Sequence, residues 1–312
     1  MIKKLILRTL YLLALPLIAA CVEMSKPPAQ KPDNNSFEFA VAYNKMVSSL
    51  RLPSADSGGF DVRRWQTVEH WLMQSESLKM AEQWHWDYVG VRQQRYPIVG
   101  YKVALGSYRV QQLFGLSEPV IGVLFEGDLL PNGESVDLLS AKNLAFEPDL
   151  LVTVKSAALN AATTVAEVAP HIDRVAAFIE LPDLMVPINP AYANAFIATN
   201  AAVRSGVVGD SVKASTDDAF IARLGTMKVV SYDQHGVQLS TASGHALMGH
   251  PYRAVLFLLE KLKRKNILLQ AGDVISLGAY AKPQKAAGYR AVSVEYHGLD
   301  PARVLRAKVS FR

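Results

Sequence analysis

The sequence predicts an α+β protein in which a small helical region precedes a mixed, mostly antiparallel β core. Between residues 37 and 94, apolar side chains recur three or four positions apart, which is the period of a helix. From Ile98 onward, short apolar runs alternate with Gly, Pro, Asn and Asp, which is typical of strands and turns. Few helical segments separate these runs, so a doubly wound parallel sheet is disfavoured.

The helical region is expected to span residues 37–97. A loop that contains Pro and Gly, at residues 53–59, divides it into two parts. Its aromatic residues recur with the apolar positions, and we interpret them as core packing. The sets at helical spacing are Trp65, Val68 and Leu72, and then Met80, Trp84 and Tyr88.

The β-rich domain is expected to span residues 98–312. One amphipathic helix, from Pro251 to Lys265, interrupts its strands; proline suits the first helical turn, and four basic residues favour the C-terminal end. The expected strands are 98–105, 150–154, 175–181, 227–232, 237–240, 274–277 and 292–296.

The first twenty residues have the pattern of a bacterial export signal. Lys3, Lys4 and Arg8 form a basic start, and an apolar run ends in Ala-Ala directly before Cys21. A cysteine at this place is typical of a lipobox, in which the thiol receives a lipid after cleavage. The alternative is an uncleaved membrane anchor, although the run is short for a span of about 20 residues.

The chain after the signal is expected to be a lipoprotein on the periplasmic side of the outer membrane. Residues 21–36 are polar and contain three prolines, so they are interpreted as a lipidated tether. Val22 follows the lipidation site; lipoproteins of diderm bacteria without Asp there resemble those sorted to the outer membrane. Cys21 is the only cysteine, so no internal disulfide can form.

The charge of the chain argues against a nucleic-acid partner. The net charge of +5 comes from 33 basic and 28 acidic residues. Removing residues 1–20 takes away three basic residues and no acidic one, which leaves 30 against 28. No basic patch with interleaved aromatic residues remains to serve as a nucleic-acid footprint.

Common catalytic signatures are absent from the sequence. There is no G-x-G-x-x-G, P-loop, G-x-S-x-G or H-E-x-x-H motif. The sole cysteine belongs to the lipobox, so a cysteine nucleophile is excluded. His245 and His250 are five positions apart, which does not place them on one helix face as a metal-binding pair.

Three carboxylates at the ends of apolar runs are the candidate metal ligands. Glu147 and Asp149 are two positions apart, so an extended chain puts both side chains on one face. Glu180 ends another apolar run, where an unpaired charge is costly. Mg²⁺ or Mn²⁺ prefers such oxygen ligands. The alternative is that all three lie in solvent at strand ends. Pro148 between the first two predicts an edge strand or a strand start.

An ordered set of motifs resembles the 2-keto-4-pentenoate hydratase family of the fumarylacetoacetate hydrolase superfamily. The likeness extends from about residue 75 to about residue 310 and implies a fold of fumarylacetoacetate-hydrolase type. The matching segments are VGYKVAL at 99–105, QQLFGL at 111–116, EP at 118–119, GVLFE at 122–126, EPD at 147–149, FIE at 178–180, NAAVRSGVVG at 200–209, GHP at 249–251 and GDVISLG at 272–278.

The resemblance also implies a site and a chemistry. A divalent metal, Mg²⁺ or Mn²⁺, would be held by Glu147, Asp149 and Glu180, where it chelates a small 2-oxo acid and stabilises its enolate. Lys102 and Glu126 match a lysine and an acid that handle protons, with Asp128 as the alternative acid. A lysine beside a metal is expected to have a lowered pKa and to act in acid–base catalysis.

Departures from the family pattern leave two functions open. Asp149 replaces the usual Glu, Thr199 replaces an Asp, Ala279 replaces a Ser or Thr of many hydratases, and the export signal is unusual for the family. The first function is a metal-dependent, hydratase-like lyase at the cell envelope; hydration, decarboxylation and C–C hydrolysis stay open. The second is an inactive lipoprotein that keeps the fold and binds a small acid or a protein. The family further implies a homo-oligomer, which membrane tethering could change.

Overall fold

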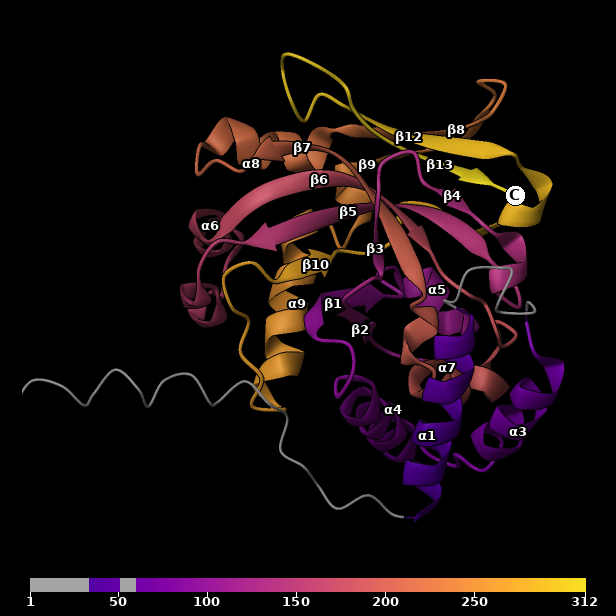
Figure 1. Cartoon of the computed structure of the whole chain (residues 1–312). Helices are drawn as coiled ribbons and strands as arrows, with labels where there is room; N and C mark the ends of the chain where they lie inside the picture. Colours follow the sequence, from indigo (N-terminus) through magenta and orange to yellow (C-terminus); the bar gives the residue numbers. More distant parts are fainter. Residues whose placement is uncertain (1–33, 51–59) are drawn as a thin grey trace, which may run out of the picture.

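The computed structural model describes residues 34–50 and 60–312 (Figure 1). The predicted signal, Cys21 and most of the predicted tether lie outside these residues. Helix α1 (Asn34–Ser49) includes the last three residues of the predicted tether, which are residues 34–36. No helix within the described ranges has the length and apolarity needed to cross a bilayer.

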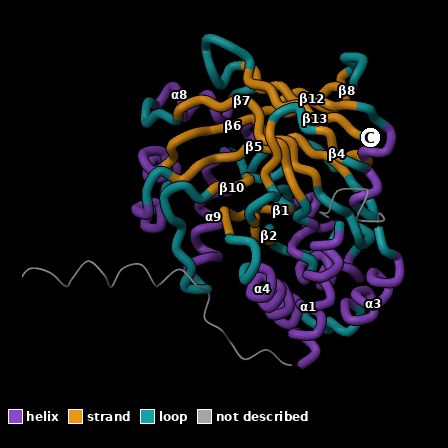
Figure 2. Tube along the Cα trace, viewed as in Figure 1, coloured by secondary structure: helices purple, strands orange, loops and turns teal. Residues whose placement is uncertain are grey.

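Helices α1, α3 and α4 form the N-terminal region, as the apolar spacing predicts (Figure 2). Asp61 and Ser77 cap α3 and α4 by accepting hydrogen bonds from backbone N–H groups of the first turns. Further helices lie among the strands, and of these the sequence predicted α9 alone. The bounds are α3 (Val62–Leu72), α4 (Leu78–Arg92), α5 (Tyr108–Leu113), α6 (Val165–Val168), α7 (Ala193–Ala198), α8 (Asp218–Thr226) and α9 (Pro251–Lys263).

Two mixed, mostly antiparallel sheets form the β-rich part, which confirms the predicted fold class. The larger sheet has the order β2-β1-β10-β5-β6-β7-β3, with β11 paired to β5, and the smaller has the order β4-β13-β12-β8-β9. The bounds are β1 (Ile98–Ala104), β2 (Val120–Phe125), β3 (Leu129–Pro131), β4 (Ser135–Val136), β5 (Ala145–Val154), β6 (Ile172–Leu181), β7 (Ser205–Lys213), β8 (Lys228–Asp233), β9 (Gln238–Ser243), β10 (Val274–Ser276), β11 (Gln284–Lys285), β12 (Ala291–His297) and β13 (Leu305–Phe311).

The smaller sheet packs against β6 and β7, while the N-terminal helices gather at the opposite end of the molecule (Figure 1). Strand β12 also reaches the centre of the larger sheet, since the Tyr296 hydroxyl donates hydrogen bonds to the backbone oxygens of Asp149 and Phe178. One continuous apolar core runs through the helical region and both sheets. The helices therefore stabilise the same core that positions the strands of the site.

The prediction that Pro148 lies in an edge strand or at a strand start is wrong. Pro148 lies inside β5, which pairs with β6 on one side and with β10 and β11 on the other. The backbone oxygen of Pro148 accepts a hydrogen bond from the N–H of Tyr280 in the segment between β10 and β11. On this side of β5 the pairing with β10 ends at Leu151 and the pairing with β11 begins at Phe146, so a residue without an N–H group is tolerated between them.

Replacing Trp84 by alanine is expected to lower the free energy of unfolding by about 3–5 kcal/mol. Trp84 is fully buried and stacks on Phe39, with ring centroids 5.1 Å apart, so the change leaves a large cavity between α1 and α4. Urea denaturation measures the effect. Trp86→Ala, two positions along the same helix at a partly exposed site, is the control and should cost much less. Equal losses would contradict the packing argument.

Candidate active site

A cavity of about 410 Å³ opens beside the central strands of the larger sheet. Lys102, Glu147 and Glu180 line it from β1, β5 and β6. The remaining walls are mostly apolar, with residues from α5, α7 and the loops around them. The apolar wall residues include Val103, Leu113, Phe114, Leu184, Val186 and Phe196.

Strand register brings the charged side chains of this cavity together. Glu147 lies directly opposite Glu180 in the β5–β6 pair, so the two side chains share one face of the sheet. Lys102 comes from β1, which pairs with β10, the other neighbour of β5. Its ammonium group forms an ion pair with Glu180, and both side chains are buried. Two predicted metal ligands and the predicted proton-handling lysine therefore meet at one place.

Burial and mutual repulsion shift the pKa values of these groups. Burial, and then the nearby Glu180, raise the pKa of Glu147 well above its usual range. Burial alone would lower the pKa of Lys102, but Glu180 and Glu147 outweigh it and raise the pKa above the usual value. The expectation of a lowered pKa for Lys102 is therefore wrong for this structure, because the carboxylates around the ammonium group stabilise its charged form.

Asp149 is buried beside these groups but does not line the cavity. Its Oδ1 accepts hydrogen bonds from the N–H groups of Leu150 (2.5 Å) and Gly278 (2.9 Å), and its Oδ2 accepts one from the Ser276 hydroxyl (2.5 Å). Burial and the charge of Glu180 still raise its pKa to about 7. Among residues 34–50 and 60–312, no three His, Cys, Asp or Glu side chains form a ready-made metal site. Two of the predicted ligands therefore face the cavity, and the third lies behind them.

The structure leaves both candidate acids of the β2–β3 turn outside the cavity. Glu126 is exposed to solvent and lines no part of it. Asp128 is fully buried, and its Oδ2 accepts a hydrogen bond from the N–H of Phe125, so it fixes the turn. Nothing in this geometry brings Glu126 or Asp128 to a substrate in the cavity.

Several cavity residues were missed in the sequence. Arg109 of α5 and Lys282 of the segment before β11 add two positive charges to the lining. Ala201 and Ala202 line it with a tight turn, and the backbone oxygen of Ala201 accepts a hydrogen bond from Lys102 Nζ at 3.2 Å. These residues come from separate segments of the chain, so no spacing along the sequence could have grouped them.

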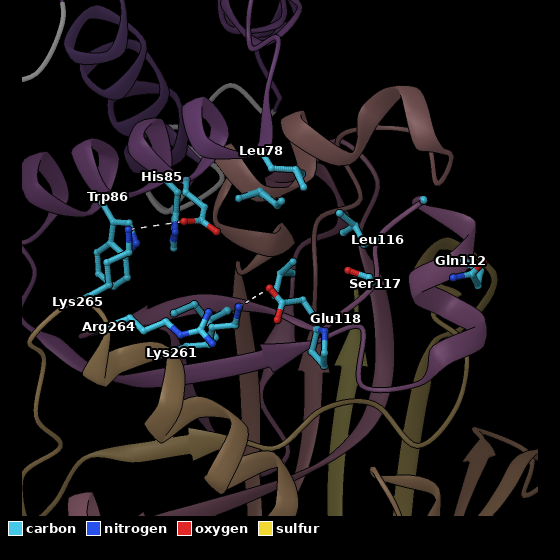
Figure 3. Close-up of a pocket in the computed structure, with 16 residues that line it drawn as sticks. Leu78, His85, Trp86, Gln112, Leu116, Ser117, Glu118, Lys261, Arg264 and Lys265 are labelled. Atoms are coloured by element: carbon cyan, nitrogen blue, oxygen red, sulfur yellow. Dashed lines mark hydrogen bonds and ion pairs between the residues drawn. The ribbon is translucent and has the colours of Figure 1, made fainter.

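A second cavity, of about 460 Å³, lies between α4, the segment before β2 and the C-terminal end of α9 (Figure 3). Three basic side chains of that end line it, namely Lys261, Arg264 and Lys265. Lys261 forms an ion pair with Glu118, and Lys265 forms one with Glu82 at 3.7 Å. The ring of His85 also borders this cavity (Figure 3).

Solved structures with the same architecture define the class of the fold. The 4-oxalocrotonate decarboxylase from Pseudomonas putida G7, in complex with calcium and acetate, aligns with a TM-score of 0.68 at 20% identity, over 88% of this chain and 98% of its own. The same enzyme with magnesium and adipate gives 0.67. A putative fumarylacetoacetate isomerase/hydrolase from Oleispira antarctica aligns with a TM-score of 0.50 at 12% identity, over 69% and 94% of the two chains. The fold is therefore of fumarylacetoacetate-hydrolase type, as the sequence predicted.

Curated proteins are also similar in sequence. A 4-oxalocrotonate decarboxylase of Pseudomonas putida is 24% identical over 202 residues, which covers 65% of this chain and 75% of the relative. A 2-keto-4-pentenoate hydratase of Burkholderia vietnamiensis is 27% identical over 208 residues, covering 66% and 77%. No protein-family model matches the sequence. Homologues of the chain are thus hydratases and decarboxylases of these two kinds, which confirms the resemblance found in the motifs.

Proposed function

We propose that the chain is a divalent-metal-dependent, hydratase-like lyase that acts on a small 2-oxo or enol carboxylic acid. The observation that carries this proposal is the meeting of Lys102, Glu147 and Glu180 inside one largely apolar cavity. The names of the homologous hydratases and decarboxylases support it. The choice between hydration, decarboxylation and C–C hydrolysis depends on the substrate.

The donor set fits a hard divalent cation. Glu147 and Glu180 are opposed across the β5–β6 ladder, and their repulsion favours a cation between them. Asp149 Oδ2 accepts a single hydrogen bond from within the described residues, so it retains a lone pair for a ligand bond. A structural neighbour binds calcium or magnesium. Bound Mg²⁺ or Mn²⁺ would supply Lewis-acid polarisation of the substrate oxygens.

The side chains of the cavity account for recognition and for proton handling. Arg109 and Lys282 give the lining positive charge that attracts a carboxylate. The mostly apolar walls lower the local dielectric, which strengthens these electrostatic interactions. Lys102 is the only lysine of the lining that is buried within the described structure, and its ammonium group can donate a proton to a substrate atom in the cavity.

Calorimetry with Mg²⁺ and Mn²⁺ on the soluble form that lacks residues 1–21 tests the metal requirement directly. Saturable binding, followed by turnover of a 2-oxo acid that stops when the metal is chelated, is the expected result. A folded protein that binds neither metal, even with oxalate or pyruvate present, would rule out the metal-dependent lyase. That result would favour the second candidate, an inactive protein in which the Lys102–Glu180 pair replaces the metal.

Metal affinity is expected to fall by roughly tenfold or more between about pH 7.5 and about pH 5.5, because ligands must lose their protons to bind. The pKa of Glu147 is raised well above its usual range, and that of Asp149 is raised to about 7. Both shifts are upward, so the carboxyl groups hold protons at higher pH than usual and compete with the metal as the pH falls. Calorimetry in buffers of different ionisation enthalpy should also detect proton release on binding. An affinity that does not change with pH would contradict this.

We also propose that the protein works at the cell envelope as a lipoprotein anchored through Cys21. The support is the signal pattern of residues 1–20 and the Ala-Ala-Cys end of that pattern. Growth of the expressing bacterium with an alkyne-labelled palmitate, followed by membrane fractionation, tests this. The wild-type chain should carry the label in the membrane fraction, and Cys21→Ala should carry none. A labelled Cys21→Ala variant would refute lipidation at this residue.

A further inference from the structure

Three consecutive residues beside the active-site cavity have left-handed backbone conformations. The φ angles are 60° at Asn200, 51° at Ala201 and 60° at Ala202. None of them is glycine, and residues with a side chain avoid this region because Cβ clashes with the backbone. All three are buried. Such strain persists only where the surrounding structure holds it, and it is concentrated at functional sites.

The side chain of Asn200 ties this turn to strand β2. Its Oδ1 accepts a hydrogen bond from the N–H of Val123 at 2.8 Å, and its Nδ2 donates one to the backbone oxygen of Val123 at 2.9 Å. Gly122 permits the close approach, since a Cβ there would lie 2.9 Å from the Asn200 backbone oxygen. The two bonds to Val123 fix which end of the amide is the acceptor.

His85 of helix α4 adds the remaining bond to this amide. Because Oδ1 of Asn200 is an acceptor, Nε2 of His85 is the donor in their 2.8 Å hydrogen bond. Burial lowers the pKa of His85 to about 4, so the ring is neutral near pH 7 and holds one fixed tautomer. The helix therefore contributes a directed hydrogen bond to the turn rather than a charge.

The turn presents a backbone acceptor to the proposed catalytic lysine. The backbone oxygen of Ala201 accepts a hydrogen bond from Lys102 Nζ at 3.2 Å, and the other partner of that ammonium group is Glu180. A cation held by Glu180 would compete with Lys102 for the carboxylate. The Ala201 oxygen would then be the contact that keeps the ammonium group in place.

We propose that His85 and Asn200 are positioning residues, which hold the left-handed turn so that the Ala201 oxygen fixes Lys102 in the cavity. This inference rests on the proposed lyase function for its kinetic consequence. Through His85, the N-terminal helical region would help to position Lys102, although none of its described residues lines the cavity.

The cavity beside His85 allows a chemical-rescue experiment (Figure 3). His85→Ala should lower kcat by roughly 10–100-fold, since misplacement of a reacting group by about 1 Å has effects of this size. Free imidazole should restore kcat by entering the vacated space. His85→Gln, whose amide nitrogen reaches about as far as Nε2, should keep most of the activity. Full activity of His85→Ala, or a loss that imidazole leaves unchanged, would overturn the proposal.

Two further variants distinguish loss of the His85–Asn200 hydrogen bond from nonspecific destabilisation of the protein. Trp86→Ala enlarges the same cavity from the same helix, and among the described residues the side-chain hydrogen bonds of Asn200 go to His85 and Val123, so imidazole should not change the kcat of this variant. His85→Asn is too short to reach Asn200 and should behave as His85→Ala does, which provides a second test if the alanine variant does not fold. An activity of His85→Asn equal to that of the wild type would also overturn the proposal.

Crystal structures of His85→Ala with and without imidazole decide the matter independently of turnover. The expected result is a relaxed φ at Ala201 and a longer distance from Lys102 Nζ to the Ala201 oxygen, both reversed by imidazole. An unchanged turn would refute the positioning role. If the wild type turns over no 2-oxo acid, the proposed function fails, while these structures still test the hold of His85 on the turn.

Discussion

Replacing Glu147 and Glu180 together by alanine is expected to weaken Mg²⁺ binding by roughly 100-fold or more and to abolish turnover. Loss of even an outer partner of a metal ligand commonly costs 10–100-fold, and these two side chains are the acids of the cavity lining. The remaining candidate, Asp149, has one Oδ2 lone pair left by its three hydrogen bonds, so it cannot replace two ligands. Calorimetry with Mg²⁺ and Mn²⁺ measures the loss.

The controls for this variant address charge and folding. Glu38→Ala with Glu76→Ala removes two exposed glutamates, so it changes the net charge equally and should leave metal binding intact. The alanine variant also removes the ion-pair partner of the buried Lys102, and this loss destabilises the fold whether or not a metal binds there. Glu147→Gln with Glu180→Gln keeps the shape and hydrogen-bonding capacity and should lose the metal equally. Retained affinity in a folded glutamine variant would place the metal elsewhere.

Local patterns were sufficient to predict the fold class and the main site strands. The helical period of residues 37–94 and the apolar runs after Ile98 reflect burial on one face, which follows directly from the sequence. Strand β13 was missed although its buried and exposed residues alternate strictly from Leu305 to Val309. Strand β5 begins at Ala145, five residues before the predicted start at Leu150. The predicted start is late because Pro148 suggests a strand boundary. Pro148 is compatible with a central strand because of how β5 pairs with β10 and β6, and this pairing cannot be deduced from the local sequence.

The site was predictable where it depends on strand period and not where it depends on long-range contacts. The spacing of Glu147 and Asp149 puts them on one face, but the hydrogen bonds that turn Asp149 from the cavity come from Ser276 and Gly278, more than 120 residues later. The left-handed turn at 200–202 contradicts local preference, since it contains no glycine. Tertiary contacts outweigh that preference, so sequence reasoning could not find it.

Replacing Lys102 by methionine is expected to lower turnover by roughly 10²–10⁴-fold, the usual contribution of a positioned proton donor or acceptor. The methionine side chain has about the same length and fits an apolar pocket, so the cavity keeps its shape. Metal affinity should be retained or should increase, because the ammonium group that competes for Glu180 is gone. Kinetics at saturating metal, together with calorimetry, separate the two effects.

The turnover and the metal affinity of Lys102→Met together distinguish a lysine that transfers a proton from one that only neutralises the charge of Glu180. If Lys102 serves only to neutralise Glu180, Lys102→Met should leave a buried, unpaired carboxylate and lose about 3–5 kcal/mol of stability, with added Mg²⁺ restoring both stability and activity. If Lys102 moves a proton, Mg²⁺ should restore stability but not activity. Lys308→Met, at an exposed strand position of the smaller sheet, should change neither. The two roles predict different activities only for metal-saturated Lys102→Met. That measurement therefore decides whether Lys102 transfers a proton or only neutralises Glu180.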